Sequence, residues 1–303
     1  MRMGTGVPRL LLGIALVAWL VRRLDPSAVL GELQALSADD LLRLLLPAVV
    51  MLSAAALNVG IFLRALSQRA PWRSTLWAVH LSRSFGAILP GRIGEWSLPS
   101  ILHRDGVPLR TGAAALLLNK SVSFVVITAA SGAAALFLVQ EPGFALRVLG
   151  VSALVLGAAL AAGWALGRIP RLRSLQEALV DVPRRHPASL LLAAGVTTAA
   201  LGLIAWSIGG PLGGPLGGPL GGGEPLPWHR ILGIHAIGML VSQVPISVGG
   251  LGVRETVMVA LFARIGADPA RVAAVYLAMA VLSLLVGGVT LLVRLVQRPR
   301  VAT

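Results

Sequence analysis

The chain has 303 residues, of which 56% are hydrophobic and only 13% are charged. Soluble domains carry about 25% charged residues, so this composition offers too little polar surface for a water-facing globule. The lack of cysteine excludes disulfides, thiol catalysis and cysteine-ligated metal sites. A formal net charge of +14 would ordinarily suggest nucleic acid, but the basic residues stand mainly between apolar runs, which indicates membrane topology instead.

The N-terminal apolar stretch is short for a membrane span. Leu10–Val21 follows Arg2 and Arg9, as in a signal peptide, but no A-x-A-like cleavage site comes after it. Arg22 and Arg23 follow instead, and they suit a retained helix whose flanking arginines reach back to the interface. We therefore expect this helix to remain in the protein.

Long apolar stretches predict a helical protein with several spans. A helix needs roughly 20 apolar residues to cross a bilayer core of about 30 Å. Such stretches are Leu44–Leu63, Thr111–Gln140, Val148–Gly167, Ala188–Ile208, Ile231–Val253 and Val272–Val293. Among them only Thr111–Gln140 contains a charge, at Lys120. We predict an all-α polytopic membrane protein with about six full spans, forming one integral membrane domain over residues 1–303.

Two segments are apolar but broken by proline and glycine. The first is Ser74–Leu102, and the second is Ile231–Arg264, interrupted at Pro245–Gly252. Irregular backbone at membrane depth is tolerated only inside protein or beside a wet cavity. We therefore expect both segments to be re-entrant, entering the bilayer and returning on the same side. The residues expected to break the helices are Pro90, Gly91, Gly94, Pro245, Gly249, Gly250 and Gly252.

The distribution of arginine predicts the topology. With a cytoplasmic N-terminus and two re-entrant segments, most arginines outside the spans lie on the cytoplasmic side, as the positive-inside rule requires. Both termini are then cytoplasmic, in the plasma (inner) membrane. The two broken segments enter from opposite sides, so the halves of the chain would form an inverted repeat, as in many transporters. Residues 209–227, with three copies of G-G-P-L, are expected to be a flexible extramembrane loop.

Charged residues inside the predicted membrane region are the candidate substrate-binding groups. Charges at that depth are costly and usually mark a pathway or a site. The candidates are Arg83, Arg92, Glu95, Lys120, Arg254 and Glu255. Helices starting after Gly94 and Gly252 would also aim their positive ends into the protein, which suits an anion such as a lipid phosphate.

A structural role for these charges is the alternative. Arg254 and Glu255 are adjacent and are expected to point apart, so Glu255 needs a partner elsewhere, for which Arg92 is the candidate. Lys120 is the only lysine and belongs either to a structural network or to the site. His235 is expected to make a local hydrogen bond between helices.

Two motifs resemble signatures of a known family. L-P-G-R-I-G-E at Leu89–Glu95 and I-S-V-G-G-L-G-V-R-E at Ile246–Glu255 are similar to those of the lysylphosphatidylglycerol synthase transmembrane, or flippase-like, family. The order of spans also matches, so the resemblance covers nearly the whole chain. It implies an integral membrane domain associated with moving aminoacylated phospholipid between leaflets. Relatives are associated with lipid-linked sugar pathways and hopanoid biosynthesis.

The sequence departs from the family pattern in two respects. Full-length synthases carry a cytosolic aminoacyl-transfer domain after the last span, whereas this sequence ends at Thr303, so we expect no lipid aminoacylation by it. In the family, a basic residue after the first motif is often followed three positions later by an acid. Lys120 fits the first position but Ser123 occupies the second, which argues against an ion pair there.

The motifs present predict lipid handling rather than catalysis. No P-loop or recognisable catalytic motif occurs, so we expect no enzyme activity, no cofactor and no metal. The leading hypothesis is a flippase-like protein that moves or handles an anionic phospholipid or a polyprenyl-linked intermediate through a midplane Arg/Glu site. Its expected partners are that membrane lipid and a separate lipid-modifying enzyme, and not nucleic acid.

Two other hypotheses remain open. One is a membrane enzyme or accessory subunit in lipid, hopanoid or lipid-linked glycan biosynthesis, with Glu95 and Glu255 as acid/base groups. The other is a scaffold whose buried charges are structural.

Overall fold

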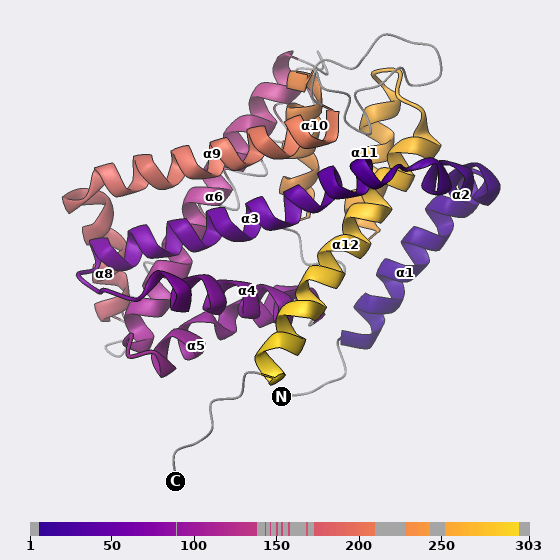
Figure 1. The fold of residues 1–303 in the computed structure, drawn as a ribbon. Helices are drawn as coiled ribbons and strands as arrows, with labels where there is room; N and C mark the ends of the chain where they lie inside the picture. The colour runs from indigo at the N-terminus through magenta and orange to yellow at the C-terminus, as the bar shows by residue number, and fades with distance from the viewer. Residues whose placement is uncertain are drawn as a thin grey trace.

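The computed structural model describes residues 6–88, 90–137, 173–209, 228–242 and 252–296, with the single residues Gly143, Leu146, Gly150, Ala153, Gly157 and Arg168. Every regular element within these residues is a helix (Figure 1). The elements are α1 (Gly6–Arg23), α2 (Pro26–Ala35), α3 (Ala38–Ala65), α4 (Trp72–Ile88), the 3₁₀ segment η2 (Pro90–Ser97), α5 (Leu98–Arg104), α6 (Leu109–Phe137), α8 (Arg173–Arg185), α9 (Pro187–Gly209), α10 (Trp228–Val241), α11 (Val253–Ala263) and α12 (Pro269–Val296). The predicted all-α membrane architecture is confirmed.

Four described helices are long and apolar enough to cross a membrane. They are α3, α6, α9 and α12, which cover four of the six stretches predicted as spans. The predicted span Val148–Gly167 lies outside the described residues apart from isolated positions. The predicted span Ile231–Val253 covers most of α10, which begins at Trp228 and ends at Val241, and reaches the start of α11 at Val253. With 14 and 11 residues, each is too short to cross a bilayer alone.

Local capping explains why α3 begins before its apolar stretch. The Ser37 hydroxyl accepts a hydrogen bond from the backbone N–H of Asp40 at 3.1 Å, and the Asp40 carboxylate accepts one from the Ser37 N–H at 3.0 Å. This reciprocal arrangement satisfies two backbone donors at the helix start. It adds a polar first turn ahead of Leu44, and α3 reaches 28 residues.

The first broken segment folds back on itself. α4 and η2 pack against each other, and the Ser74 hydroxyl at the start of α4 donates a hydrogen bond to the Asp105 carboxylate just after α5. The two ends of the segment therefore lie together. The prediction that an α-helix starts after Gly94 is wrong, because residues 90–97 form η2 and α5 starts at Leu98. Pro99 lies in the first turn of α5, where its missing N–H is not needed.

The same order of elements occurs twice. A long helix, a broken helical pair and a second long helix appear as α3, α4–η2–α5 and α6, and again as α9, α10–α11 and α12. The long helices α3 and α9 pack side by side in opposite directions (Figure 1). Between them, the Asn58 amide donates a 3.0 Å hydrogen bond to the Thr197 hydroxyl.

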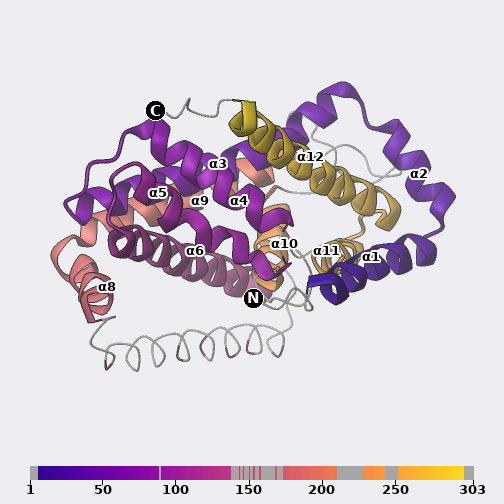
Figure 2. The same cartoon turned by 90° about the horizontal axis from the view of Figure 1, so that it is seen from below.

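The last helix connects the two halves. α12 packs against α3 and α4 and, near its start, against α2 (Figure 2). At that end the Arg271 guanidinium donates to the Glu32 carboxylate at 3.0 Å. Because α12 contacts both the first broken pair and α11, it brings those two elements to one place.

Candidate functional site

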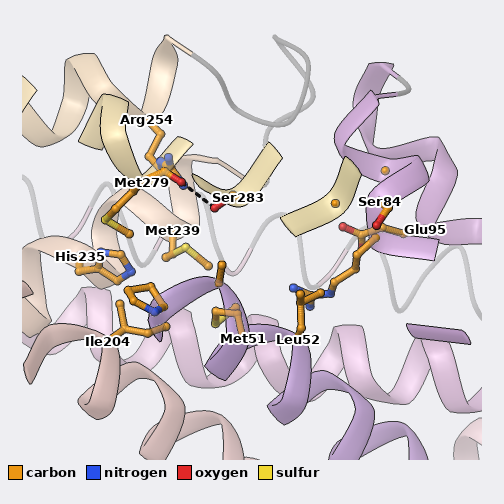
Figure 3. A pocket seen from close by; sticks show the side chains of 15 residues that line it. Met51, Leu52, Ser84, Glu95, Ile204, His235, Met239, Arg254, Met279 and Ser283 are labelled. Carbon is orange, nitrogen blue, oxygen red and sulfur yellow. Dashed lines mark hydrogen bonds between the residues drawn. The ribbon is translucent and has the colours of Figure 1, made fainter. Parts of the chain in front are cut away.

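A cavity of about 190 Å³ lies where the two halves meet. Residues from both broken elements and from the long helices α3, α9 and α12 form its wall (Figure 3). The lining residues are Pro47, Ala48, Met51, Leu52, Arg83, Ser84, Gly86, Glu95, Ile204, His235, Met239, Arg254, Met279, Ser283 and Gly287. Three predicted site residues, Arg83, Glu95 and Arg254, therefore share one cavity.

Glu255 holds the Arg254 guanidinium in place at the cavity wall. Arg254 Nε and Nη2 donate to Glu255 Oε1 at 3.1 and 2.8 Å, while Glu255 Oε2 accepts from the Gly252 N–H at 2.6 Å. Glu255 is fully buried and is not part of the cavity lining. By accepting the hydrogen bond from the Gly252 N–H, Glu255 also caps the helix. This explains why α11 begins at Val253, directly after Gly252 with its positive φ of 82°.

The prediction that Arg254 and Glu255 point apart is wrong. Adjacent Cβ atoms on a helix do diverge, but the long arginine side chain folds back to reach the neighbouring carboxylate. Glu255 thus has a partner in Arg254, and the expected pairing of Glu255 with Arg92 stays a prediction. Arg92 has its backbone in η2, and its side chain lies outside the described residues.

An aromatic pair supports Arg254 from the other side. The Arg254 Cζ atom lies 6.0 Å from the centre of the Tyr276 ring, within the range of a cation–π contact. The Tyr276 hydroxyl is hydrogen-bonded to His235 Nδ1 at 3.2 Å, joining α12 to α10. The expected interhelical hydrogen bond of His235 is confirmed, and His235 also lines the cavity. Arg254 is therefore held by groups from α11 and α12.

Glu95 occupies another part of the cavity, beside Ser84 (Figure 3). It is 7% exposed, and the Lys120 ammonium donates to its Oε2. The argument from Ser123 against an ion pair of Lys120 is therefore wrong, because the acid comes from η2 rather than from the same helix. The spacing of residues along one helix cannot predict an ion pair with a residue from another element.

A second, much smaller cavity lies on the Lys120 side of Glu95. It measures about 10 Å³, near the lower limit of space for one water molecule, and Arg83, Glu95, Asn119 and Lys120 are among its lining residues. The buried Asn119 Oδ1 has no hydrogen-bond partner among the described atoms. Glu95 and Arg83 line both cavities, so these side chains separate the main cavity from the inner polar one.

The predicted helix-breaking residues divide into two groups. Pro90, Gly91 and Gly94 lie in η2, and Gly252 caps α11. Pro245, Gly249 and Gly250 lie outside the described residues.

Sequence reasoning missed several lining and supporting residues. Tyr276 is the single tyrosine of the chain, and its position inside an otherwise apolar span was a usable signal of the same kind as Lys120. Met51, Met239 and Met279 line the cavity, but methionine in an apolar span carries no distinguishing signal. These flexible thioethers give the wall an adaptable apolar surface.

The arrangement is suited to bind a small anionic group beside apolar atoms. Arginine recognises phosphate and carboxylate through its planar set of donors, and here two arginines line one cavity. Within the described part of the chain, no group of three or more histidine, aspartate or glutamate side chains is placed to hold a metal ion.

Comparison with known proteins agrees with the motifs. The family model described as lysylphosphatidylglycerol synthase TM region matches residues 7–290, nearly the whole chain. No curated protein matches the sequence. The extent of the family match identifies an integral membrane protein with a lipid-related function. The chain belongs to the lysylphosphatidylglycerol synthase TM region family.

Proposed function

We propose that this protein moves an anionic lipid, either a phospholipid or a lipid-linked intermediate, across the bilayer by binding its headgroup in the main cavity. The observation that carries the proposal is the presence of Arg83 and Arg254 in one cavity between membrane-spanning helices. Charges in such a place are costly to maintain and are usually functional. A phosphate would offset that cost through charge-assisted hydrogen bonds.

The proposal includes the topology expected from the sequence. The two broken elements are re-entrant, both termini are cytoplasmic, and the halves form an inverted repeat in the plasma membrane. The repeated element order and the opposite directions of α3 and α9 support this arrangement. A site at the interface of inverted repeats is accessible in turn from each side when one half rocks against the other.

The surroundings of Arg254 favour anion binding over a structural ion pair alone. Glu255 Oε1 accepts from Nε and Nη2, and no hydrogen bond from Nη1 is found within the described residues. The two hydrogen bonds to Glu255 Oε1 and the contact with the Tyr276 ring hold the guanidinium in place while Arg254 lines the cavity. A preorganised donor of this kind loses little entropy when a ligand binds.

An acid/base role for the two glutamates is supported less well. Glu255 is fully buried, lies behind Arg254 and uses both carboxylate oxygens in hydrogen bonds. Glu95 is the acidic residue that lines the main cavity, and it is paired with Lys120. A reaction requiring two cooperating carboxylates would lack the second one within the described part of the chain.

The test is transport of a labelled anionic lipid in proteoliposomes. Arg254→Gln alone would leave Glu255 buried without its cation, so the double variant Arg254→Gln/Glu255→Gln is measured as well. We expect both to slow transport by roughly 10- to 100-fold, the scale of a lost charge-assisted hydrogen bond. The matched control is Arg185→Gln, which changes an exposed arginine on α8.

The folded state of each variant is checked by gel filtration and thermal unfolding. Wild-type transport rates in a well-folded double variant would contradict the proposal. So would equal transport of anionic and zwitterionic lipids that remains unchanged in both arginine variants.

A further inference from the structure

His235 on α10 lines the main cavity, although its side chain is almost completely buried. Figure 3 shows it on the same side of the cavity as Arg254, with Glu95 and Ser84 on the opposite side. An anion that lies beside His235 and Arg254 is therefore kept away from the Glu95 carboxylate, which would repel it.

The Tyr276 hydroxyl determines which nitrogen of the His235 ring carries the proton. The hydroxyl oxygen lies 3.2 Å from Nδ1, and it has no other hydrogen bond within the described residues. Because Tyr276 is fully buried, a hydroxyl hydrogen without an acceptor would be costly. The hydroxyl therefore donates the hydrogen bond and Nδ1 accepts it.

The His235 ring is consequently neutral, with its proton on Nε2. A neutral imidazole has a single N–H, and Nδ1 can accept only when that N–H is the other nitrogen. A positively charged ring would donate from Nδ1 as well and leave the tyrosine hydrogen without an acceptor. It would also add a cation to a cavity wall that already includes Arg83 and Arg254.

The Nε2 atom is accessible from the cavity. It makes no hydrogen bond within the described residues, yet it is not among the fully buried side-chain atoms there that lack a partner. Nη1 of Arg254 likewise makes no hydrogen bond in the described part of the chain. Both N–H groups are thus donors that a ligand in the cavity can use.

Tyr276 positions both donors. Its ring stacks on the His235 ring, with the ring centres 6.1 Å apart and the planes inclined by 24°. The Arg254 Cζ atom lies 6.0 Å from the centre of the same tyrosine ring. The two donors are therefore fixed by one buried residue before a ligand arrives, which reduces the entropy lost on binding.

We infer that His235 is a further binding residue of the main cavity: its Nε2–H donates to a phosphate oxyanion that Arg254 Nη1 binds at the same time. This inference rests on the proposed function and names the side of the cavity where the phosphate is recognised. A neutral donor adds a hydrogen bond to the anion without a further charge that must remain buried when the cavity is empty. Free phosphate and lipid phosphate share this chemistry.

His235→Asn is the variant that tests the donor. The asparagine Oδ1 can replace Nδ1 as the acceptor for Tyr276, but the shorter side chain places no N–H where Nε2 was. We expect binding of inorganic phosphate by the purified protein, and transport of a fluorescent anionic phospholipid, to fall by about 10-fold, the scale of one hydrogen bond to a charged group. His235→Gln, whose longer amide places an N–H near the position of Nε2, should restore most of both.

The matched control is His229→Asn, the same change at an exposed histidine at the start of α10. Each variant is checked for folding by gel filtration and thermal unfolding. Should His235→Asn unfold, Tyr276→Phe replaces it, because that change keeps the ring beside Arg254 and removes only the hydroxyl that fixes the tautomer. Binding and transport equal to those of the wild-type protein in the folded variant would overturn the inference.

The protonation of the ring is measured without reference to transport. Nitrogen-15 NMR of the full chain with labelled histidine distinguishes protonated from unprotonated ring nitrogens, and the His235 signals are identified by their loss in His235→Asn or His235→Gln. We expect the proton on Nε2 in the wild-type protein and a mixture of tautomers in Tyr276→Phe. The Nε2 signal should shift when inorganic phosphate or the anionic phospholipid is added. A proton on Nδ1 in the wild-type protein, or a signal that responds to neither ligand, would overturn the inference.

The same measurements separate the two sources of the oxyanion and the two proposals. Binding of the phospholipid but not of inorganic phosphate through His235 would assign the oxyanion to a lipid, whereas competition between the two would show that free phosphate also enters. Phosphate binding that depends on His235 in a protein that transports no lipid would count against the proposed function and leave the histidine donor supported. Lipid transport that is unaffected by His235→Asn would overturn the inference and leave the proposed function standing.

Discussion

Glu95 connects the main cavity with the inner polar cavity. Its carboxylate lines both spaces, and its partner Lys120 comes from α6 across the smaller one. Both charges are largely removed from water, with side-chain exposures of 9% for Glu95 and 33% for Lys120. Removing one partner of such a pair strands the other charge, which costs more than the pair itself contributes.

The charge pair predicts a strongly non-additive mutant cycle. Lys120→Met and Glu95→Gln should each lower the free energy of unfolding by about 3 kcal/mol, because each removes one partner of a partly buried ion pair. The double variant should lose clearly less than the sum of the two. Chemical unfolding of the purified protein in detergent micelles measures all three. Additive losses would mean that Glu95 and Lys120 do not interact.

At the scale of elements, glycine permits η2 to lie directly on α4. A Cβ on Gly94 would come within 2.1 Å of the Phe85 carbonyl carbon and 2.3 Å of the Gly86 nitrogen. A Cβ on Gly86 would in turn lie 2.7 Å from Glu95 Cγ. The position of Glu95 in the cavity thus depends on the missing side chains of two glycines, one in each partner of this contact.

Gly94→Ala is expected to displace η2 and destabilise the protein. The atoms in its way belong to backbone, which cannot move aside as a flexible side chain does, so the cost should reach about 3 kcal/mol at the upper end for overpacking. Gly60→Ala in α3 is the control, because nothing lies within 4 Å of its new Cβ. That change should be neutral or stabilising by about 0.5–1 kcal/mol, since alanine favours a helix.

Thermal unfolding in detergent compares the two alanine variants under identical conditions. Equal melting temperatures for Gly94→Ala and Gly60→Ala would show that η2 does not pack on α4 as described. Lipid transport by Gly94→Ala should also fall, since Glu95 moves with η2.

For the whole molecule, the repeated order of elements places one broken pair in each half. α12 contacts α4 from the first half and α11 from the second, and the cavity forms between them. Neither half contains the cavity alone, because Arg83 and Glu95 come from the first and Arg254 from the second. The binding site is thus a property of the assembled chain.

The proposed topology predicts on which side of the membrane the C-terminus and residues 210–227 lie. A green fluorescent protein fused to the C-terminus should be fluorescent in bacterial cells, because it folds in the cytoplasm. The proposed topology places residues 210–227 on the opposite side of the membrane. The same reporter fused there should be dark, and alkaline phosphatase placed there should be active. Alkaline phosphatase activity at the C-terminus would contradict the proposed orientation.

The sequence alone predicted that this is a helical membrane protein and which charged residues lie in its apolar segments. Both predictions depend only on the composition of short stretches of the chain. Long apolar runs predicted α3, α6, α9 and α12, and family motifs led to the same fold. Arg83, Glu95 and Arg254 were conspicuous as charges in apolar surroundings. The cost of burying a charge is a property of its depth in the membrane, and hydropathy along the chain reports that depth.

Only the tertiary structure decided how those charges pair. Spacing along the chain suggested that Arg254 and Glu255 point apart and argued against an ion pair for Lys120, whereas Glu255 binds Arg254 and Lys120 binds Glu95. The pairing of charges depends on which helices come into contact and on how far flexible side chains reach. The local pattern of residues along the chain predicts neither. The cavity has the same origin, since it lies where helices distant in the sequence do not fill the space between them.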